Sequence, residues 1–184
     1  MLESLADALD RYKPRTDAEA ADVARVRDLL PGDPWSRDTL LHVTASAVIV
    51  HPPTRRALLR WHARQRAWLQ VGGHGDPGET APLAVALREG REETGLDDLV
   101  PWPDGQLVHV AVVSVTPSAT EPAHEHADLR FVLATGTPEA VRPEKPGADM
   151  RWLSIPDAQE LAGPDNLRET LARADELLSR PARG

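Results

Sequence analysis

The chain has 184 residues, no cysteine and a formal net charge of −8 at pH 7. The absence of cysteine excludes disulfides, a thiol nucleophile and thiolate metal ligands, so any metal must be held by oxygen or imidazole. The negative charge disfavours long nucleic acids, and 41% hydrophobic with 27% charged residues, without a long apolar run, predicts a soluble globular protein rather than a membrane protein.

Residues 1–36 are predicted to form a helical extension packed on the domain that follows. Leucines recur at near-helical spacing from Leu2 to Leu9, and a second apolar series covers residues 21–30 after a turn signal at 13–17. Two prolines and a glycine within residues 31–34 end this series. The first residues include acids and contain neither a basic leader nor an apolar stretch, which predicts a cytoplasmic location.

Residues 37–184 are interpreted as one domain that mixes strands and helices. Strands are predicted at residues 42–50, 57–61, 68–71, 107–115, 128–135 and 150–153, and helices at 82–94 and 166–179. Segments 42–50 and 107–115 are apolar at both parities, which is typical of strands covered on two faces. Loops are expected at 101–105, 117–123 and 137–148, and the last is long enough to suggest a function. We therefore expect an α/β sandwich.

The helix at 82–94 has clear end signals. Thr80 is expected to be the N-cap, and Pro82 suits the first turn, so the helix should begin near Ala81. Thr94 and Gly95 mark its end, and Gly95 is expected to be the C-cap.

Three glutamates gather at the end of this helix. Glu89, Glu92 and Glu93 fall within an arc of about 100° on a helical wheel. Like charges at this spacing oppose each other by roughly 0.2 to 0.5 kcal/mol per pair, and they also meet the negative end of the helix dipole. A divalent cation such as Mg²⁺ removes both penalties, so the cluster predicts a metal site. The alternative is a solvated acidic face, with Arg88 and Arg91 reducing the repulsion.

A glycine-rich stretch precedes the helix. Gly72, Gly73, Gly75 and Gly78 would let the backbone approach a ligand closely, so a carbonyl oxygen from this loop could complete the metal shell. His74 follows the glycine pair directly and is a candidate contact for a substrate phosphate. The alternative for His74 is a loop side chain bonded to the backbone.

The glycines and acids together resemble the signature of Nudix hydrolases, in which a glycine, a glutamate and the pattern Arg-Glu-x-x-Glu-Glu-x-Gly follow one another. Here the pattern is carried by Gly73, Glu79, Arg88, Glu89, Glu92, Glu93 and Gly95. The resemblance extends to WLQVGG before the loop and to MRWLSIP near the end, and covers residues 40–160. It implies a Nudix-type α/β/α sandwich with a central mixed sheet. It also implies Mg²⁺-assisted or Mn²⁺-assisted hydrolysis of a nucleoside diphosphate linked to another moiety.

The resemblance also implies roles for individual residues. The three glutamates of the helix would ligate the metal, Gly73 would offer its carbonyl oxygen, and Arg88 would pair with Glu79 to orient the helix. The family often recruits a further acid from a later loop, and Glu144 occupies a comparable place. Glu121 and Glu125 compete with Glu144 for that role.

Two positions depart from the family pattern. Eight residues separate Glu79 from Arg88, where seven are usual, and Gly90 stands where a bulky aliphatic residue is expected. The extra residue is predicted to lie within 80–82, because an insertion inside the helix would rotate every later residue by about 100°. Gly90 is expected to allow close contact between the helix and the sheet.

Several alternatives stay open. His124 and His126 are candidates for the site, but histidines beside a strand start are more often surface residues. A nucleotide-sensing module with this fold and no turnover is the alternative to an enzyme. Isomerisation of a prenyl diphosphate is disfavoured because that branch of the family depends on cysteine. The expected partner is a small phosphorylated substrate related to a nucleotide, and a homodimer is considered.

Overall fold

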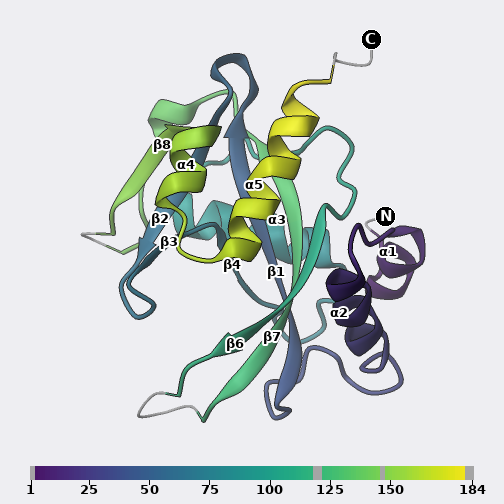
Figure 1. Cartoon of the computed structure of the whole chain (residues 1–184). Helices are drawn as coiled ribbons and strands as arrows, with labels where there is room; N and C mark the ends of the chain where they lie inside the picture. The colour runs from purple at the N-terminus through teal and green to yellow at the C-terminus, as the bar shows by residue number, and fades with distance from the viewer. Residues whose placement is uncertain (1–2, 118–121, 146–147, 181–184) are drawn as a thin grey trace.

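A mixed sheet of eight strands forms the centre of the molecule (Figure 1). The computed structural model describes residues 3–117, 122–145 and 148–180. The elements, in chain order, are α1 (Leu5–Arg11), α2 (Asp17–Arg27), β1 (Leu41–His51), β2 (Arg56–His62), β3 (Ala67–Leu69), β4 (Val71–His74), α3 (Pro82–Thr94), β5 (Val100–Pro101), β6 (His109–Val115), β7 (His124–Ala134), β8 (Met150–Ser154), α4 (Ile155–Leu161) and α5 (Asp165–Leu178), with 3-10 turns at Pro52–Thr54 and Pro138–Ala140.

Strands β1 and β7 are the central pair of the sheet. They run parallel, with His42 opposite His126 and Thr44 opposite Asp128. The main strand order is β3-β2-β1-β7-β5, while β4 pairs with the first half of β1, β6 with β7 and β8 with β2, all antiparallel. The glycine-rich strand β4 therefore lies beside the beginning of β1, where Thr44 is opposite His74.

The two faces of β1 belong to two separate apolar cores. Val43, Ala45, Ala47 and Ile49 are buried in the core that contains residues of α3. Val48 and Val50 are buried in the core formed with α4 and α5. Because alternate side chains of a strand point to opposite faces, this double burial explains why the segment is apolar at both parities.

Helices cover both faces of the sheet. Helices α4 and α5 lie across the face seen in Figure 1, and α3 lies behind the sheet. Apolar residues of α1 and α2, among them Leu9 and Val26, join the core on the α3 side. The predicted α/β/α sandwich with a mixed sheet is confirmed, whereas the domain boundary at residue 36 stays a prediction. In the described part of the chain, no helix is both long and apolar enough to cross a membrane.

The strand predicted at 68–71 is wrong as a single element. It is divided into β3, which pairs with β2, and β4, which pairs with β1. Strand β7 begins at His124 rather than at Asp128, because its first residues are paired with β1 on one side and with β6 on the other. Both differences come from pairing with distant segments, which local periodicity does not record.

Two short elements were not expected. Val100 and Pro101 form β5 at the edge of the sheet, although 101–105 was predicted to be a loop. Helix α4 starts at Ile155 and has Ser154 as its N-cap, whose hydroxyl accepts the Asp157 amide, and a proline lies in its first turn. This cap was readable in the sequence Ser-Ile-Pro-Asp. Parts of the predicted loops 117–123 and 137–148 lie outside the described residues.

Candidate active site

Helix α3 presents its acids from a well-defined position. Its N-cap is Ala81 and not the predicted Thr80, and no side chain caps the helix there. The Thr80 carbonyl instead accepts the Leu5 amide at 3.2 Å, which ties α1 to this turn. Gly95 ends the helix at φ 66°, as predicted, and its amide donates to the Arg91 carbonyl at 2.7 Å. The helix is continuous from residue 82, so the extra residue of the signature precedes it.

Gly90 lies where α3 comes closest to the sheet. A Cβ atom at this position would be 3.0 Å from Leu99 Cδ1 and 3.4 Å from Leu133 Cδ1. The expected close contact between helix and sheet is confirmed, because no larger side chain fits without displacing these leucines.

Arg88 connects the glycine-rich segment to the helix. Its Nε and Nη2 donate to the two carboxylate oxygens of Glu79 at 3.1 and 2.9 Å. The same guanidinium donates to the His74 carbonyl at 2.8 Å, to Glu89 at 2.9 Å and to Glu92 at 3.0 Å. The hydrogen bond from Arg88 lowers the pKa of Glu79. Such a bidentate pair fixes both geometry and charge.

Glu93 and Glu89 face the backbone of the glycine pair. Glu93 accepts the Gly72 amide at 3.1 Å and contacts Arg60 Nη2 at 2.8 Å. A Cβ atom added to Gly73 would lie 2.6 Å from the Glu89 carboxylate. A side chain at this position would therefore displace the Glu89 carboxylate from the glycine backbone.

The acid cluster is short of positive charge. Burial raises the pKa of Glu93 to about 7, although Arg60 and the Gly72 amide act in the opposite direction. Burial also raises the pKa of Glu89. Arg88 is shared between this cluster and Glu79. Buried carboxylates with raised pKa values and too few cations are the donor set that a hard divalent cation would complete.

The loop after β7 approaches the end of α3. The Glu144 amide donates to the Glu93 carbonyl at 3.1 Å, and the Arg142 amide donates to the Thr94 carbonyl at 2.6 Å. Glu125 instead pairs with Arg25 of α2 at 2.5 Å. Glu121 lies outside the described residues. Of the competing acids that the structure describes, Glu144 is the one beside the cluster.

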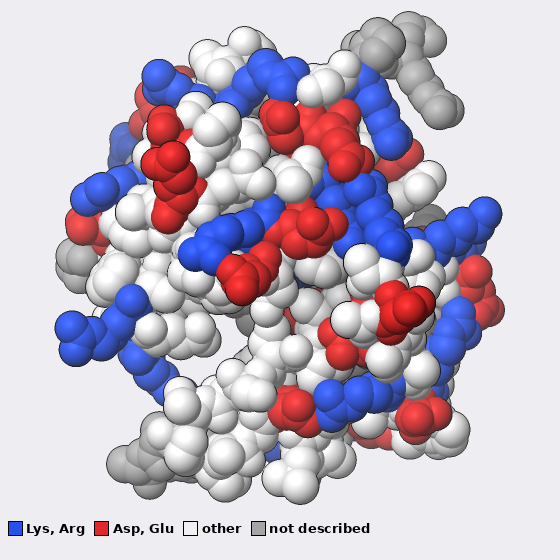
Figure 2. Space-filling model, in the orientation of Figure 1, with Lys and Arg blue, Asp and Glu red and all other residues white. Residues whose placement is uncertain are grey.

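A polar cleft of about 340 Å³ opens beside Gly72 and Gly73, on the face of the sheet covered by α4 and α5. Figure 2 shows this face, which is hollowed near the start of α5. Asp128, on the floor of the cleft, is buried and accepts the hydroxyls of Thr44 at 3.1 Å and Ser46 at 2.8 Å. Arg130 Nε also donates to Asp128, at 2.8 Å.

Two buried polar atoms of this cleft have no hydrogen-bond partner among the described residues. They are Arg60 Nε and Gln70 Oε1. Buried polar atoms are rarely left unpaired, so both are available to a bound ligand. Sequence reasoning missed these residues, together with Asp128 and Arg130. The alternation of polar and apolar residues along 126–131 was the available signal.

The imidazole of His74 points toward other histidines. Its Nε2 lies 3.1 Å from Nε2 of His42, and its ring centroid is 4.8 Å from that of His126. Burial, followed by the charges of neighbouring histidines, lowers the pKa of His126 to about 3, so this ring is neutral at pH 7. His124 and His126 belong to β7 itself and are only partly exposed.

The mixed sheet between helices and the acids of α3 define an α/β protein built around a carboxylate site. Its sequence matches the NUDIX domain over residues 40–174. The chain therefore belongs to the NUDIX domain family, which confirms the resemblance seen in the signature.

Solved structures share the fold at low sequence identity. The E. coli dihydroneopterin triphosphate pyrophosphohydrolase is 21% identical, with a TM-score of 0.55 over 71% of this chain and 92% of that one. A C. elegans Ap4A hydrolase binary complex is 19% identical, with a TM-score of 0.59 over 74% of this chain and 97% of that one. The M. smegmatis Nudix hydrolase RenU is 20% identical, with a TM-score of 0.51 over 74% of this chain and 84% of that one. No significant match was found among curated proteins.

Proposed function

We propose that this protein is a metal-dependent pyrophosphohydrolase that cleaves a pyrophosphate bond in a nucleoside diphosphate linked to another moiety. The observation that carries the proposal is the pair of half-buried carboxylates, Glu89 and Glu93, packed against the backbone of Gly72 and Gly73. A folded protein without a ligand gains nothing from burying carboxylates whose pKa values are raised.

The metal is proposed to be Mg²⁺, with Mn²⁺ as a substitute. Its ligands would be Glu89, Glu92 and Glu93, with the carbonyl oxygen of Gly73, because hard cations prefer carboxylate and carbonyl oxygens. When bound, such an ion polarises the phosphoryl group and activates a water molecule.

The residues of the chain position the reacting groups. Arg88 holds the glycine-rich strand against α3 through its bonds to Glu79 and to the His74 carbonyl. Burial raises the pKa of Glu93 to about 7 in the metal-free site, and a cation bound there would favour its ionised form. Glu144, whose backbone is bonded to Glu93, is proposed as the additional acid.

The substrate is proposed to bind in the cleft beside the glycine pair. Arg60 lines this cleft and contacts Glu93, so it can bridge an anionic substrate to the acid cluster. Unpaired atoms of Arg60 and Gln70 offer a donor and an acceptor. The names of two structural neighbours, which act on dihydroneopterin triphosphate and on Ap4A, support a polyphosphate substrate. The direct substrate contact of His74, the homodimer and the cytoplasmic location stay predictions.

A substrate panel tests the proposal. Nucleoside triphosphates, dinucleoside polyphosphates, nucleotide sugars and ADP-ribose would be incubated with Mg²⁺ or Mn²⁺, and the products would be separated by chromatography. We expect hydrolysis of at least one compound, loss of hydrolysis with EDTA, and loss in Glu93→Gln. Glu160→Gln, at an exposed position on α4, is the matched control and should keep full activity.

Two outcomes would contradict the proposal. Unchanged hydrolysis in Glu93→Gln would place the chemistry elsewhere. Tight binding of a nucleotide by the wild-type protein, without turnover of any compound in either metal, would instead support a nucleotide-sensing module.

A further inference from the structure

Four of the seven histidines of the chain lie together on one face of the sheet. His42 is opposite His126 in the parallel pair, and His74 is opposite Thr44 in the neighbouring antiparallel pair. Residues paired across strands point to the same face, as do residues two apart in one strand. The register of three strands therefore directs His42, His74, His124 and His126 to one side.

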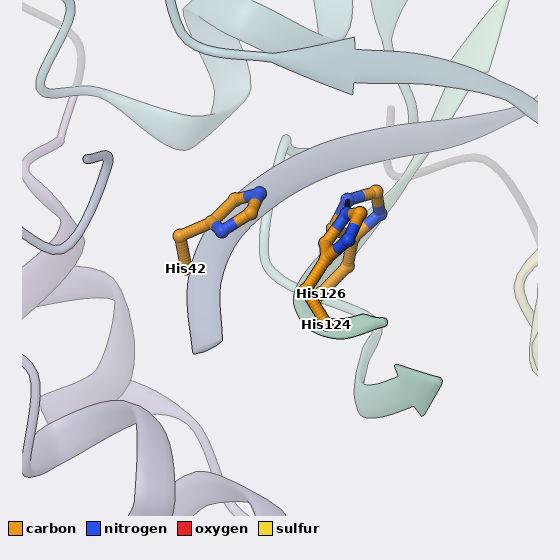
Figure 3. A group of neighbouring side chains, drawn as sticks. All are labelled: His42, His124 and His126. Carbon is orange, nitrogen blue, oxygen red and sulfur yellow. Dashed lines mark hydrogen bonds between the residues drawn. The ribbon is translucent and has the colours of Figure 1, made fainter. Parts of the chain in front are cut away.

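Their ring nitrogens converge. The Nε2 atoms of His124 and His126 are 3.1 Å apart, as are those of His42 and His74. One nitrogen from each of His42, His124 and His126 can be chosen so that all three lie within 4.8 Å of one another. Figure 3 shows His42 extending from β1 toward the pair of rings on β7.

Backbone carbonyls orient two of the rings. His42 Nδ1 is 3.2 Å from the Thr39 carbonyl, and His124 Nδ1 is 2.9 Å from the Pro122 carbonyl. A carbonyl can only accept, so each Nδ1 carries a proton, and in the neutral ring the lone pair is then on Nε2. Both Nε2 atoms are directed into the histidine cluster. A carbonyl that fixes the tautomer in this way is the usual outer-shell partner of a metal-binding histidine.

The spacing suits a tetrahedral transition-metal ion. Zinc–nitrogen bonds of about 2.0 to 2.1 Å place tetrahedral ligands about 3.3 Å apart. The Nε2 separations of 3.1 Å within the pairs His42–His74 and His124–His126 are close to this value, and the nitrogens of His42, His124 and His126 lie within 4.8 Å of one another. Imidazole ligands favour Zn²⁺, Ni²⁺, Co²⁺ and Cu²⁺, whereas Mg²⁺ prefers oxygen. In the described part of the chain, the group that converges consists of histidines without a carboxylate.

We propose that His42, His124 and His126 form a second metal site, for a transition-metal ion of the Zn²⁺ class, with His74 as its fourth ligand. This site is chemically distinct from the carboxylates of α3. An ion bound there would link β4 to β1 and β7.

The proposed histidine site lies beside the strand that faces the acids of α3. Arg88 binds the carbonyl of His74, and Gly73 lies against Glu89. An ion held by the His74 ring would therefore hold in place the strand that faces the acids. His126 lines the polar cleft, and His74 lines a second opening that also contains Glu89. The ion would stand between the two openings.

Zinc titration of the full chain tests the proposal. Protein stripped of metal with a chelator would be titrated with Zn²⁺ by calorimetry in excess Mg²⁺, and bound zinc would be counted after desalting. We expect one Zn²⁺ per chain for the wild type and for Glu93→Gln. Affinity should fall by at least about 100-fold in His42→Asn, His124→Asn and His126→Asn, and by about 10-fold in His74→Asn.

His51→Asn is the matched control, because His51 lies at the other end of β1 and bonds to Thr54. It should bind zinc like the wild type.

A second measurement needs no variant: Co²⁺ added to the wild-type protein should give the intense visible absorption of tetrahedral coordination. Unchanged zinc affinity in His124→Asn and His126→Asn, or a wild-type protein that binds no Zn²⁺ and gives no tetrahedral Co²⁺ spectrum, would overturn the proposal. Loss of zinc in Glu93→Gln alone would assign the ion to the carboxylates and would overturn it too.

Discussion

Two glutamates whose side chains have little exposed surface, Glu19 and Glu93, have opposite electrostatic environments. Glu19 of α2 is contacted by Arg173 of α5 through two nitrogens, at 2.7 and 3.0 Å, and by the Arg15 amide at 2.6 Å. Burial would raise the pKa of Glu19, but hydrogen bonds from Arg173, Tyr12 and Arg15 lower it to about 2. Glu93 has one amide and one arginine as partners, and its pKa rises to about 7.

The comparison separates a structural ion pair from a carboxylate that we propose to be a metal ligand. Burial is similar, since the side chains of Glu19 and Glu93 are 3% and 12% exposed. The number of donors differs, and donors decide whether a buried carboxylate stays ionised. Glu19 joins the N-terminal helices to α5 and has all the partners it needs. Glu93 lies among other acids, and its single arginine and single amide do not offset the effect of burial on its pKa.

The largest expected effect is on activity in Glu93→Gln. We expect kcat/KM to fall by about 1,000-fold, or about 4 kcal/mol of transition-state stabilisation, because a neutral amide binds a divalent cation poorly. The free energy of unfolding of the metal-free variant should not fall, because the substitution removes a buried charge. Steady-state kinetics and urea unfolding measure the two effects. A large loss of stability would mean that Glu93 is a structural residue like Glu19.

Glu19→Gln should show the reverse behaviour. The Arg173 side chain, 2% exposed, would lose its buried partner, and we expect the free energy of unfolding to fall by about 3 kcal/mol. The kcat of the folded variant should not change. Glu169→Gln is the control, because Glu169 contacts the same arginine but is 47% exposed, so its loss should cost less than about 1 kcal/mol. Equal losses in the two variants would contradict the comparison.

Acid should weaken the ion pair between Glu19 of α2 and Arg173 of α5 in a defined range of pH. The pKa of Glu19 is lowered from 4.5 to about 2 in the folded protein, so its contribution is complete above pH 4.5 and is lost as the pH falls toward 2. Burial lowers the pKa of His109 from 6.5 to about 4, so its contribution is lost as the pH falls from 6.5 to 4. Between pH 6.5 and 4.5 the raised pKa of Glu93 acts in the opposite direction to His109, so the test is made below pH 4.5, where the melting temperature should decline. Below pH 4.5 the decline should be shallower in Glu19→Gln, and identical slopes would refute this assignment.

Gly90→Ala is expected to have the smallest effect. The new Cβ would meet Leu99 Cδ1 at 3.0 Å, and the cost of overpacking is partly offset by the better helix propensity of alanine. We expect a net loss of about 1 kcal/mol in the free energy of unfolding. Gly32→Ala is the control, because its nearest neighbour would be 3.7 Å away. A more stable Gly90→Ala variant would show that the helix can move away from the sheet without cost.

Much of the acid site was readable from the sequence because it is built from local spacing. Helical periodicity brings Glu89, Glu92 and Glu93 to one face, and Gly95 marks the end of the helix. The extra residue before the helix did not prevent Arg88 from reaching Glu79, since a loop absorbed it. The same local rules placed Thr80 one residue too early as a cap, because they do not record its contact with α1.

Residues outside the signature depended on contacts between distant segments. Asp128 meets Thr44 and Ser46 only because β7 pairs with β1 in one parallel register. A shift of that register by one residue would turn each of these side chains to the opposite face. Arg60 contacts Glu93 although it belongs to β2, which is far from α3 in the sequence.

The sequence by itself determined the family, the alternation of strands and helices, and the acid face of α3, since each follows from spacing within one segment. Only the tertiary structure decided that the charge of Glu19 is paired with enough donors to stay ionised while that of Glu93 is not. It also decided that four histidines from three strands meet. The physical reason is that burial and pairing of charges depend on which segments pack together, and that choice is made by the whole chain.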